Sequence, residues 1–282
     1  MAAPLEMSPA GAEAIPETVT SGLSPQRIEG RSLGQIAWLQ PDFVTRDGQV
    51  LLAIQALVVE TPSSRIVIDT CVGNDRKGRG LPNWNDLQTS FLKDFAKAGF
   101  GRETIDIVFC THMHPDHIGW NTMLQKGAWV PTFPKARYLV GRKEFEYWSS
   151  LRGIEQVEVV YKDSIEPIIR ADLLEQIDLP FSLCPEISLV PTPGHTPGHA
   201  SVQIKSAGES AMISGDFIHH PLQMAVPDIS QRADSDPVVA VVTRRWQLGQ
   251  LVDTGSLLIG THFAPPTAGK VRADGDVFRF EV

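Results

Sequence analysis

The chain has 282 residues, and 42% of them are hydrophobic, which is enough to build the core of an ordinary globular protein. Its formal net charge is −8, and its basic residues are scattered, so a nucleic acid is not expected as a partner. No apolar run approaches the roughly 20 residues that a membrane span needs, so no membrane partner is expected. The three cysteines have no paired spacing, which favours a reducing compartment, and we expect a cytoplasmic protein.

The beginning of the chain differs in composition from the rest. Residues 1–27 are rich in Ala, Pro, Glu, Ser and Gly, which predicts a flexible N-terminal arm. This segment has neither the basic start nor the apolar core of a secretory signal. Residues 28–282 show no composition break, so they are predicted to form a single domain.

Strand-like and helix-like runs alternate along the predicted domain and indicate a layered α/β fold. The longest predicted helix has Asp236 as its N-cap, Pro237 in its first turn and Gly255 as its stop signal. The predicted strands are 35–38, 49–59, 65–69, 105–110, 137–140, 187–190, 201–204, 211–214, 257–260, 270–272 and 277–280, and the predicted helices are 86–98, 143–149 and 236–251.

The most informative motif is His-x-His-x-Asp-His, which directly follows the predicted strand 105–110. It places four metal-ligand types within six residues, His112, His114, Asp116 and His117. Side chains two residues apart in extended backbone point to the same side, so His112 and His114 can reach one ion. Asp116 and His117 follow a proline bend and suit a second ion. The motif therefore predicts a metal site at the end of a strand.

Three more predicted strands end in residues of the same kind, namely His195, Asp216 and His262. In each case a glycine shortly before the ligand-type residue permits a tight turn. A catalytic zinc ion usually takes three protein ligands, and a pair of ions needs more ligands and a bridging group. The chain supplies enough candidates for two ions.

This ordered set resembles the metallo-β-lactamase superfamily of dinuclear hydrolases. The resemblance covers roughly residues 34–282 and implies a four-layer αβ/βα sandwich. It also implies that Asp69 is the family's structural aspartate, although a strand-end turn residue is an equal alternative. The resemblance assigns His112, His114 and His195 to the first metal, Asp116, His117 and His262 to the second, and Asp216 to a bridging position.

The same resemblance implies which metal ions the site binds and which reaction it catalyses. Two divalent ions are expected, in the first place zinc, with manganese, iron or cobalt as alternatives. They would activate a hydroxide, while Asp116 would also hold the proton for the leaving group. The chain has no Gly-x-Ser-x-Gly nucleophile motif. The expected reaction is hydrolysis of an ester, lactone, amide or phosphoester of small size.

Features of individual branches of this superfamily narrow the range of expected substrates. True β-lactamases of this fold typically lack an aspartate at the position of Asp216, and the chain has no room after His262 for the helical extension of glyoxalase II-type thioesterases. Segments 215–219, 234–237 and 258–262 resemble methyl parathion hydrolase-like proteins. We expect a hydrolase of small esters or lactones with an organophosphate triesterase side activity. A phosphodiesterase, a nuclease, a thioesterase and a non-catalytic metal-binding protein are the alternatives, and homodimer formation is left open.

His219 lies three residues after Asp216, where quorum-sensing lactonases have a tyrosine that assists the carbonyl group. We therefore expect a catalytic role for His219 beside Asp116, with a wall residue as the alternative. His199 is expected to be structural. The following side chains are candidates for an apolar substrate pocket, although each is more typical of the core: Trp84, Trp120, Phe217, Met224 and Phe263.

Overall fold

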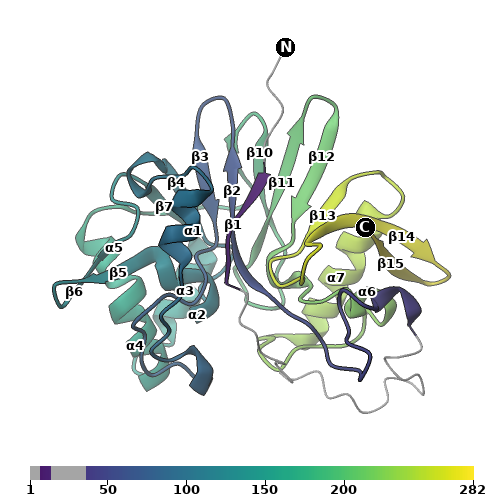
Figure 1. Cartoon of the computed structure of the whole chain (residues 1–282), viewed down its shortest axis with the longest axis horizontal. Coiled ribbons are helices and arrows are strands. Elements are labelled where there is room, and N and C mark those ends of the chain that lie inside the picture. The colour runs from purple at the N-terminus through teal and green to yellow at the C-terminus, as the bar shows by residue number, and fades with distance from the viewer. Residues whose placement is uncertain (1–6, 14–35) are drawn as a thin grey trace. The chain divides into compact units, whose positions relative to one another are not determined.

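The computed structural model describes residues 7–13 and 36–282, and the chain divides into two compact units (Figure 1). Unit 1 contains Met1–Glu13 and Ile54–Leu179, and unit 2 contains Ala14–Ala53 and Pro180–Val282. Residues 7–13 of the expected N-terminal arm form a strand, whereas the rest of that arm lies outside the described residues. The single domain expected over residues 28–282 stays a prediction.

Unit 1 is built on a six-stranded mixed sheet, whose strands are, in sheet order, β1 (Met7–Glu13), β2 (Ile54–Glu60), β3 (Arg65–Ile68), β4 (Ile107–Phe109), β7 (Arg137–Gly141) and β8 (Leu174–Ile177). The pairs β1·β2 and β2·β3 are antiparallel, and β3, β4, β7 and β8 run parallel. Because Ile68 pairs with Phe109, the residues after β3 and after β4 leave the sheet at the same edge. Functional side chains of parallel sheets gather at this carboxyl edge.

The helices of unit 1 are short, and several were not predicted. The predicted helix 86–98 begins only at residue 91, and the predicted helix 143–149 is confirmed. Unit 1 also contains a separate hairpin of β5 (Thr122–Gln125) and β6 (Ala128–Pro131). The helices are α1 (Phe91–Lys97), α2 (Pro115–Ile118), α3 (Arg142–Ser150), α4 (Glu155–Ser164) and α5 (Glu166–Arg170), with 3-10 turns at η3 (Pro82–Trp84), η4 (Arg102–Thr104) and η5 (Gly119–Asn121).

Unit 2 is built on a seven-stranded sheet, whose strands are, in sheet order, β15 (Val277–Glu281), β14 (Ala268–Asp274), β13 (Leu257–Ile259), β12 (Glu209–Ile213), β11 (Ala200–Ser206), β10 (Ile187–Pro191) and β9 (Phe181–Cys184). Only β12 and β13 pair in parallel, with Ile213 opposite Ile259. The residues after these two strands therefore leave the sheet at the same edge. The predicted closing hairpin is confirmed as β14 and β15.

One strand prediction in unit 2 is wrong. The segment predicted as strand 35–38 forms the 3-10 turn η2 (Ala37–Leu39) in its described part. Four residues are too few to separate a strand from a turn by periodicity, and here the burial of Leu39 in the core decides. Residues 49–53 of the predicted strand 49–59 belong to unit 2, where Val50 and Leu52 form isolated bridges with Val44 and Phe263.

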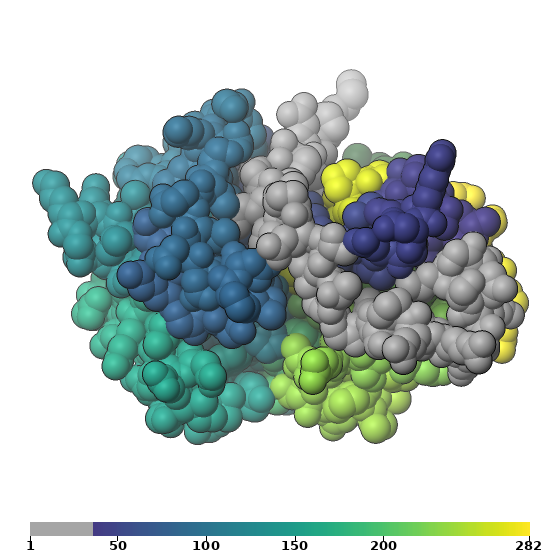
Figure 2. Space-filling model, turned by 60° about the horizontal axis from the view of Figure 1, so that its bottom comes forward, coloured from purple at the N-terminus to yellow at the C-terminus, as the bar shows by residue number. Residues whose placement is uncertain are grey.

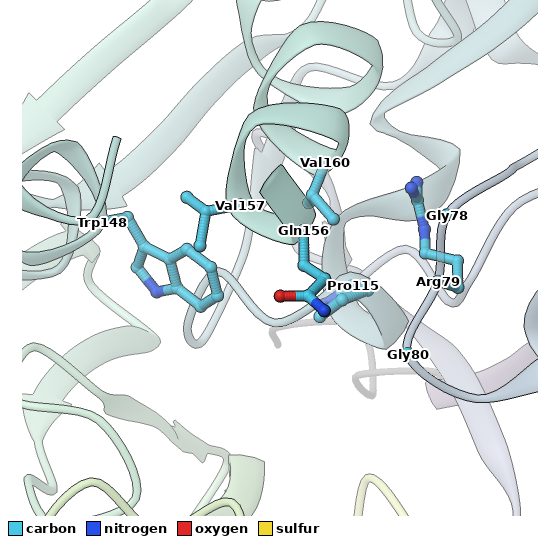
Figure 3. Close-up of a pocket in the computed structure, with 8 residues that line it drawn as sticks. All are labelled: Gly78, Arg79, Gly80, Pro115, Trp148, Gln156, Val157 and Val160. Carbon is cyan, nitrogen blue, oxygen red and sulfur yellow. The ribbon is translucent and has the colours of Figure 1, made fainter. Parts of the chain in front are cut away.

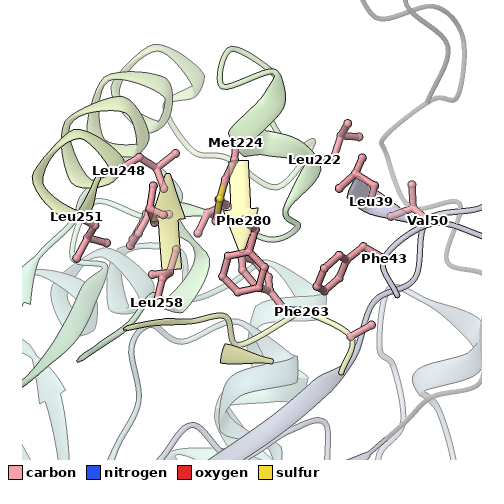
Figure 4. Packing of buried hydrophobic residues seen from close by; sticks show 14 of the residues in the cluster. Leu39, Phe43, Val50, Leu222, Met224, Leu248, Leu251, Leu258, Phe263 and Phe280 are labelled. Carbon is pink, nitrogen blue, oxygen red and sulfur yellow. The ribbon is translucent and has the colours of Figure 1, made fainter. Parts of the chain in front are cut away.

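The core of unit 2 is an apolar cluster that lies between its sheet and its helical segments (Figure 4). These segments include the 3-10 turn η6 (Gly215–Phe217) and the helices α6 (Leu222–Ala225) and α7 (Pro237–Leu251). The rings of Phe43, Phe263 and Phe280 meet edge to face, with centroids 5.2–6.5 Å apart. As predicted, the Asp236 side chain caps α7 by accepting hydrogen bonds from two backbone N–H groups. No helix in the described part of the chain is long and apolar enough to cross a membrane.

Candidate metal site

The four ligand-type residues of the His-x-His-x-Asp-His motif lie together in unit 1. His112 and His114 are in the loop after β4, and Asp116 and His117 are in α2. Nε2 of His112 is 2.9 Å from Nδ1 of His114, so these two ring nitrogens face the same position. The rings of His112 and His117 have their centroids 4.1 Å apart, and Nε2 of His117 is 3.7 Å from Oδ2 of Asp116. The loop thus concentrates imidazole and carboxylate groups, of which His112 and His117 are buried and His114 and Asp116 partly buried.

Asp69, at the end of β3, holds this loop in place. Its carboxylate accepts hydrogen bonds from the Thr111 backbone N–H at 2.8 Å and from the Thr111 hydroxyl at 2.9 Å. It also accepts a hydrogen bond of 2.8 Å from Nδ1 of His117, which orients that ring. The Thr111 hydroxyl in turn lies 3.1 Å from Nδ1 of His112. Such outer contacts fix the orientation of metal-binding imidazoles, so Asp69 fits its expected structural role.

Glu144 of α3 supports the same loop and was not predicted from the sequence. Its side chain is 1% exposed and accepts hydrogen bonds from the Met113 backbone N–H at 2.9 Å and from Nε1 of Trp148 at 2.8 Å. The Trp148 ring meets His114 edge to face at 5.5 Å. No spacing rule links residue 144 to residue 113, because only the packing of α3 against the loop brings them together.

Unit 2 gathers its ligand-type residues around one carboxylate oxygen. Oδ2 of Asp216 lies 3.4 Å from Nε2 of His195, 3.0 Å from Nε2 of His219 and 3.3 Å from Nε2 of His262. The ligand atoms of His195, Asp216 and His219 all lie within 4.8 Å of one another. All four side chains are buried. Unit 2 thus brings His195, Asp216 and His262, its three predicted ligands, to one point.

The second ring nitrogen of two of these histidines is held by an acceptor. Nδ1 of His195 donates to Oδ1 of Asp234 at 2.8 Å, and Nδ1 of His262 donates to the carbonyl of Ala53 at 2.9 Å. As neutral rings, they therefore present the lone pairs of their Nε2 atoms toward Asp216. Burial raises the pKa of Asp234, and the neighbouring charge of His219 opposes that shift. Asp234 was not predicted to contact His195, because 39 residues separate them.

His219 differs from the other histidines of this cluster. Its Nδ1 is buried and has no hydrogen-bond partner among the described residues. Its position is fixed through the backbone, because its N–H donates to Oε1 of Gln223 at 2.7 Å. The His219 ring therefore keeps one buried nitrogen without a hydrogen-bond partner among the described residues.

His199 and His220 have structural roles. His199 uses both ring nitrogens, since Nδ1 donates to the carbonyl of Thr192 at 2.9 Å and Nε2 accepts the Asp216 backbone N–H at 2.7 Å. It therefore positions the backbone of Asp216, as expected for a structural histidine. His220 is bonded to the carbonyl of Phe43 at 2.9 Å, and burial lowers its pKa to about 4.

Glycines allow the turns that carry the ligand-type residues of unit 2. Gly194 has a φ of 131° and Gly215 a φ of 56°, values that side-chain-bearing residues rarely adopt. Gly260 is required for a different reason, because a Cβ there would lie 2.2 Å from the Phe263 ring. The expected tight turns before His195 and Asp216 are therefore present.

A small apolar pocket of about 90 Å³ lies in unit 1 (Figure 3). It is bordered by Pro115 of the ligand loop and by Trp148, whose ring contacts His114. Val157 and Val160 of α4 add to its apolar wall, and the rest of the lining is Gly78, Arg79, Gly80 and Gln156. The five aromatic and Met side chains suggested as pocket candidates do not line it. Trp120, Phe217, Met224 and Phe263 are core residues with at most 5% exposure, and Trp84 is half-buried.

Comparisons with known proteins agree with this fold. The family model of the metallo-beta-lactamase superfamily matches residues 50–276. An N-acyl homoserine lactonase of a Bacillus species is 26% identical over 172 residues, which are 56% of this chain and 61% of the relative. Another, from Bacillus cereus, is 24% identical over 55% of this chain and 59% of the relative. The chain thus spans about three fifths of the length of these curated relatives.

Solved structures of this superfamily match the fold of the chain as well. The crystal structure of AbOPH, a hydrolase in the β-lactamase superfamily, has a TM-score of 0.77 and 24% identity, over 99% of this chain and 94% of that chain. AidC, described as a dizinc quorum-quenching lactonase, has a TM-score of 0.71 and 26% identity, over 89% of this chain and 86% of that chain. The expected fold class and superfamily are confirmed, while the likeness to the lactonase-like and methyl parathion hydrolase-like branch stays a prediction. By its matched family model, its mixed sheets and its structural relatives, the chain belongs to the metallo-β-lactamase superfamily.

Proposed function

We propose that this chain is a dinuclear metal-dependent hydrolase of small carboxylic esters and lactones. The observation that supports this most strongly is the convergence of three imidazole nitrogens on Oδ2 of Asp216 at 3.0–3.4 Å. The proposed ligands remain those assigned by the family resemblance: His112, His114 and His195 for one ion, Asp116, His117 and His262 for the other, and Asp216 for both.

The chemistry of the donor set supports a cation. His195 and His262 donate through Nδ1 to other acceptors, so their Nε2 lone pairs point at the lone pairs of a buried carboxylate. Buried acceptors that face each other are unfavourable unless a proton or a cation lies between them. Imidazole and carboxylate ligands suit zinc and also accept manganese, iron or cobalt. The residues present therefore fit a divalent metal, with zinc as the first expectation.

Bound ions of this kind supply a hydroxide near neutral pH and polarise the oxygen of a carbonyl group. Asp116 can accept a proton on its carboxylate and deliver it to the leaving oxygen. His219 is proposed to contact the substrate through Nδ1, which has no hydrogen-bond partner within the described residues. Asp69 and Asp234 orient the imidazoles and do not contact the reacting atoms.

Two observations favour an ester or lactone with a small apolar portion. The pocket beside Pro115 has an apolar wall of Trp148, Val157 and Val160, with Arg79 and Gln156 also in its lining, so its apolar side suits a small alkyl or acyl group. The curated relatives of comparable sequence are N-acyl homoserine lactonases. Organophosphate triester hydrolysis is proposed as a side activity. The net charge of −8 disfavours the polyanionic substrates of a nuclease.

A substrate panel tests this proposal. Purified protein, stripped with a chelator and reloaded with zinc, is assayed on aryl esters, lactones, thioesters, a phosphotriester and bis-p-nitrophenyl phosphate. We expect the highest kcat/KM on esters or lactones and the loss of all activity in the stripped protein. Activity confined to the phosphodiester would favour the nuclease alternative, and activity confined to thioesters would favour a thioesterase.

Two variants separate a metal-dependent reaction from general damage to the fold. Asp216→Asn should lower kcat/KM by at least about 100-fold and release bound metal, because it removes a charge from the proposed ligand set. His199→Ala should have a smaller effect on metal content, because the bond that His199 makes to Asp216 is to its backbone N–H. Equal loss of metal in both variants would contradict the proposed division of roles.

A further inference from the structure

The exposed face of α7 is unusually apolar for a surface helix. Val238, Val242 and Trp246 recur every fourth residue and are 74%, 62% and 60% exposed. Val239, which is 37% exposed, borders them on the same face. Residues four apart lie above one another on a helix, so these side chains form a continuous stripe. Part of the yellow-green segment that contains α7 lies at the surface in Figure 2.

The helix α7 itself carries few charged side chains. Between Pro237 and Leu251 the charged side chains are Arg244, which is buried, and Arg245, which is paired with Asp228 at 2.7 Å. The whole chain has a net charge of −8, so two copies repel each other through their net charge. The neutral face of α7 is therefore a surface on which two copies can meet without like-charge repulsion.

The order of side chains along the stripe makes it self-complementary. If two α7 helices lie antiparallel across a twofold axis at Val242, the large Trp246 of one copy faces the small Val238 of the other. A large side chain is then matched with a small one on both sides of the axis. Gly249 lies one turn beyond Trp246 and presents no side chain that would keep the helices apart.

The size of the stripe fits the centre of such an interface. Its four side chains form a patch on the order of 400 Å², comparable to the largest apolar patch of a typical monomer. A stable pair of proteins buries roughly 800 Å² on each partner, around an apolar centre with a polar rim. Arg245 and Gln250 flank the stripe and can form part of that rim.

We propose that the Val238–Val242–Trp246 stripe of α7 is the centre of a symmetric homodimer interface. The partner is a second copy of this chain, and the two helices lie antiparallel with Val242 on the twofold axis.

The test uses the full chain and measures its mass by sedimentation velocity from about 1 to about 100 µM. We expect wild type to approach twice the monomer mass of 30.9 kDa as the concentration rises. Val242→Glu and Val242→Lys should each be monomeric, because each places two like charges together at the axis. Both residues have a higher helix propensity than valine, so α7 should remain folded, which circular dichroism checks.

An equimolar mixture of the Val242→Glu and Val242→Lys variants provides the decisive measurement. Opposite charges then meet at the axis, so the mixture should regain the dimer mass that neither variant shows alone. Ile154→Glu is the matched control, because Ile154 is an apolar residue of unit 1 with 48% exposure and should leave the dimer intact. The proposal would be overturned by a wild type that is monomeric throughout, which is expected if another segment of its own chain covers the stripe. A Val242→Glu variant that dimerises like wild type, or a mixture that stays monomeric, would overturn it as well.

Discussion

Replacement of Asp234 tests whether outer contacts set the metal affinity of this site. The Asp234 side chain is fully buried, and its two oxygens serve two donors: Oδ1 accepts from Nδ1 of His195 at 2.8 Å, and Oδ2 accepts the Gln231 backbone N–H at 2.7 Å. In Asp234→Asn one oxygen becomes an NH₂ group, which cannot accept from either donor. The amide can therefore satisfy His195 or Gln231, but not both.

We expect Asp234→Asn to weaken metal binding by 10- to 100-fold, which corresponds to about 1.4–2.7 kcal/mol. Asp234→Ala should lie at the upper end of that range, because it removes both acceptors. Metal affinity is measured by competition with a chromogenic chelator, and kcat/KM is measured on the best substrate of the panel. If both variants held metal as tightly as wild type while remaining folded, the orienting role of Asp234 would be refuted.

The remaining predictions concern two neighbouring histidines. His219→Ala should lower kcat/KM by about 10- to 100-fold while both metals stay bound, since its Nδ1 is proposed to contact substrate; unchanged kinetics on every substrate class would make His219 a wall residue. His220 has its pKa lowered from 6.5 to about 4 by burial, so its neutral form stabilises the fold above pH 6.5, and about 3 kcal/mol of that stability is lost as the pH falls toward 4. The unfolding free energy of His220→Gln, compared with wild type in metal-free protein, should therefore show a difference that shrinks from pH 7 to pH 4, and a pH-independent difference would contradict this.

The sequence predicted the elements that carry the site because their signals are local. Strands 65–69, 105–110 and 257–260 are apolar runs that end in ligand-type residues, and the structure contains them as β3, β4 and β13. The N-cap of α7 was equally visible, since Asp236 and Pro237 are adjacent in the sequence.

Elements without a strong local pattern were missed. The helix α4 and the strand β8 have mixed apolar and charged residues with only partial burial, so neither period stands out. The η2 turn was mistaken for a strand because the packing of Leu39 decides its conformation.

The outer contacts of the site could not be predicted either. Asp234 and Glu144 meet His195 and Met113 across 39 and 31 residues, and only the folded backbone brings them together. The resemblance had singled out the segment that contains Asp234, but it assigned no role to that side chain. Similarly, the pocket is lined by Trp148 and two valines of α4, whose spacing in the sequence is typical of an ordinary amphipathic helix.

The metal content of active protein tests the central claim most directly. Elemental analysis of the reloaded full chain, combined with kcat/KM on the same sample, should give two divalent ions per chain, with activity rising as the second ion binds. A fully active sample that holds only one ion per chain at saturating metal would contradict the dinuclear account.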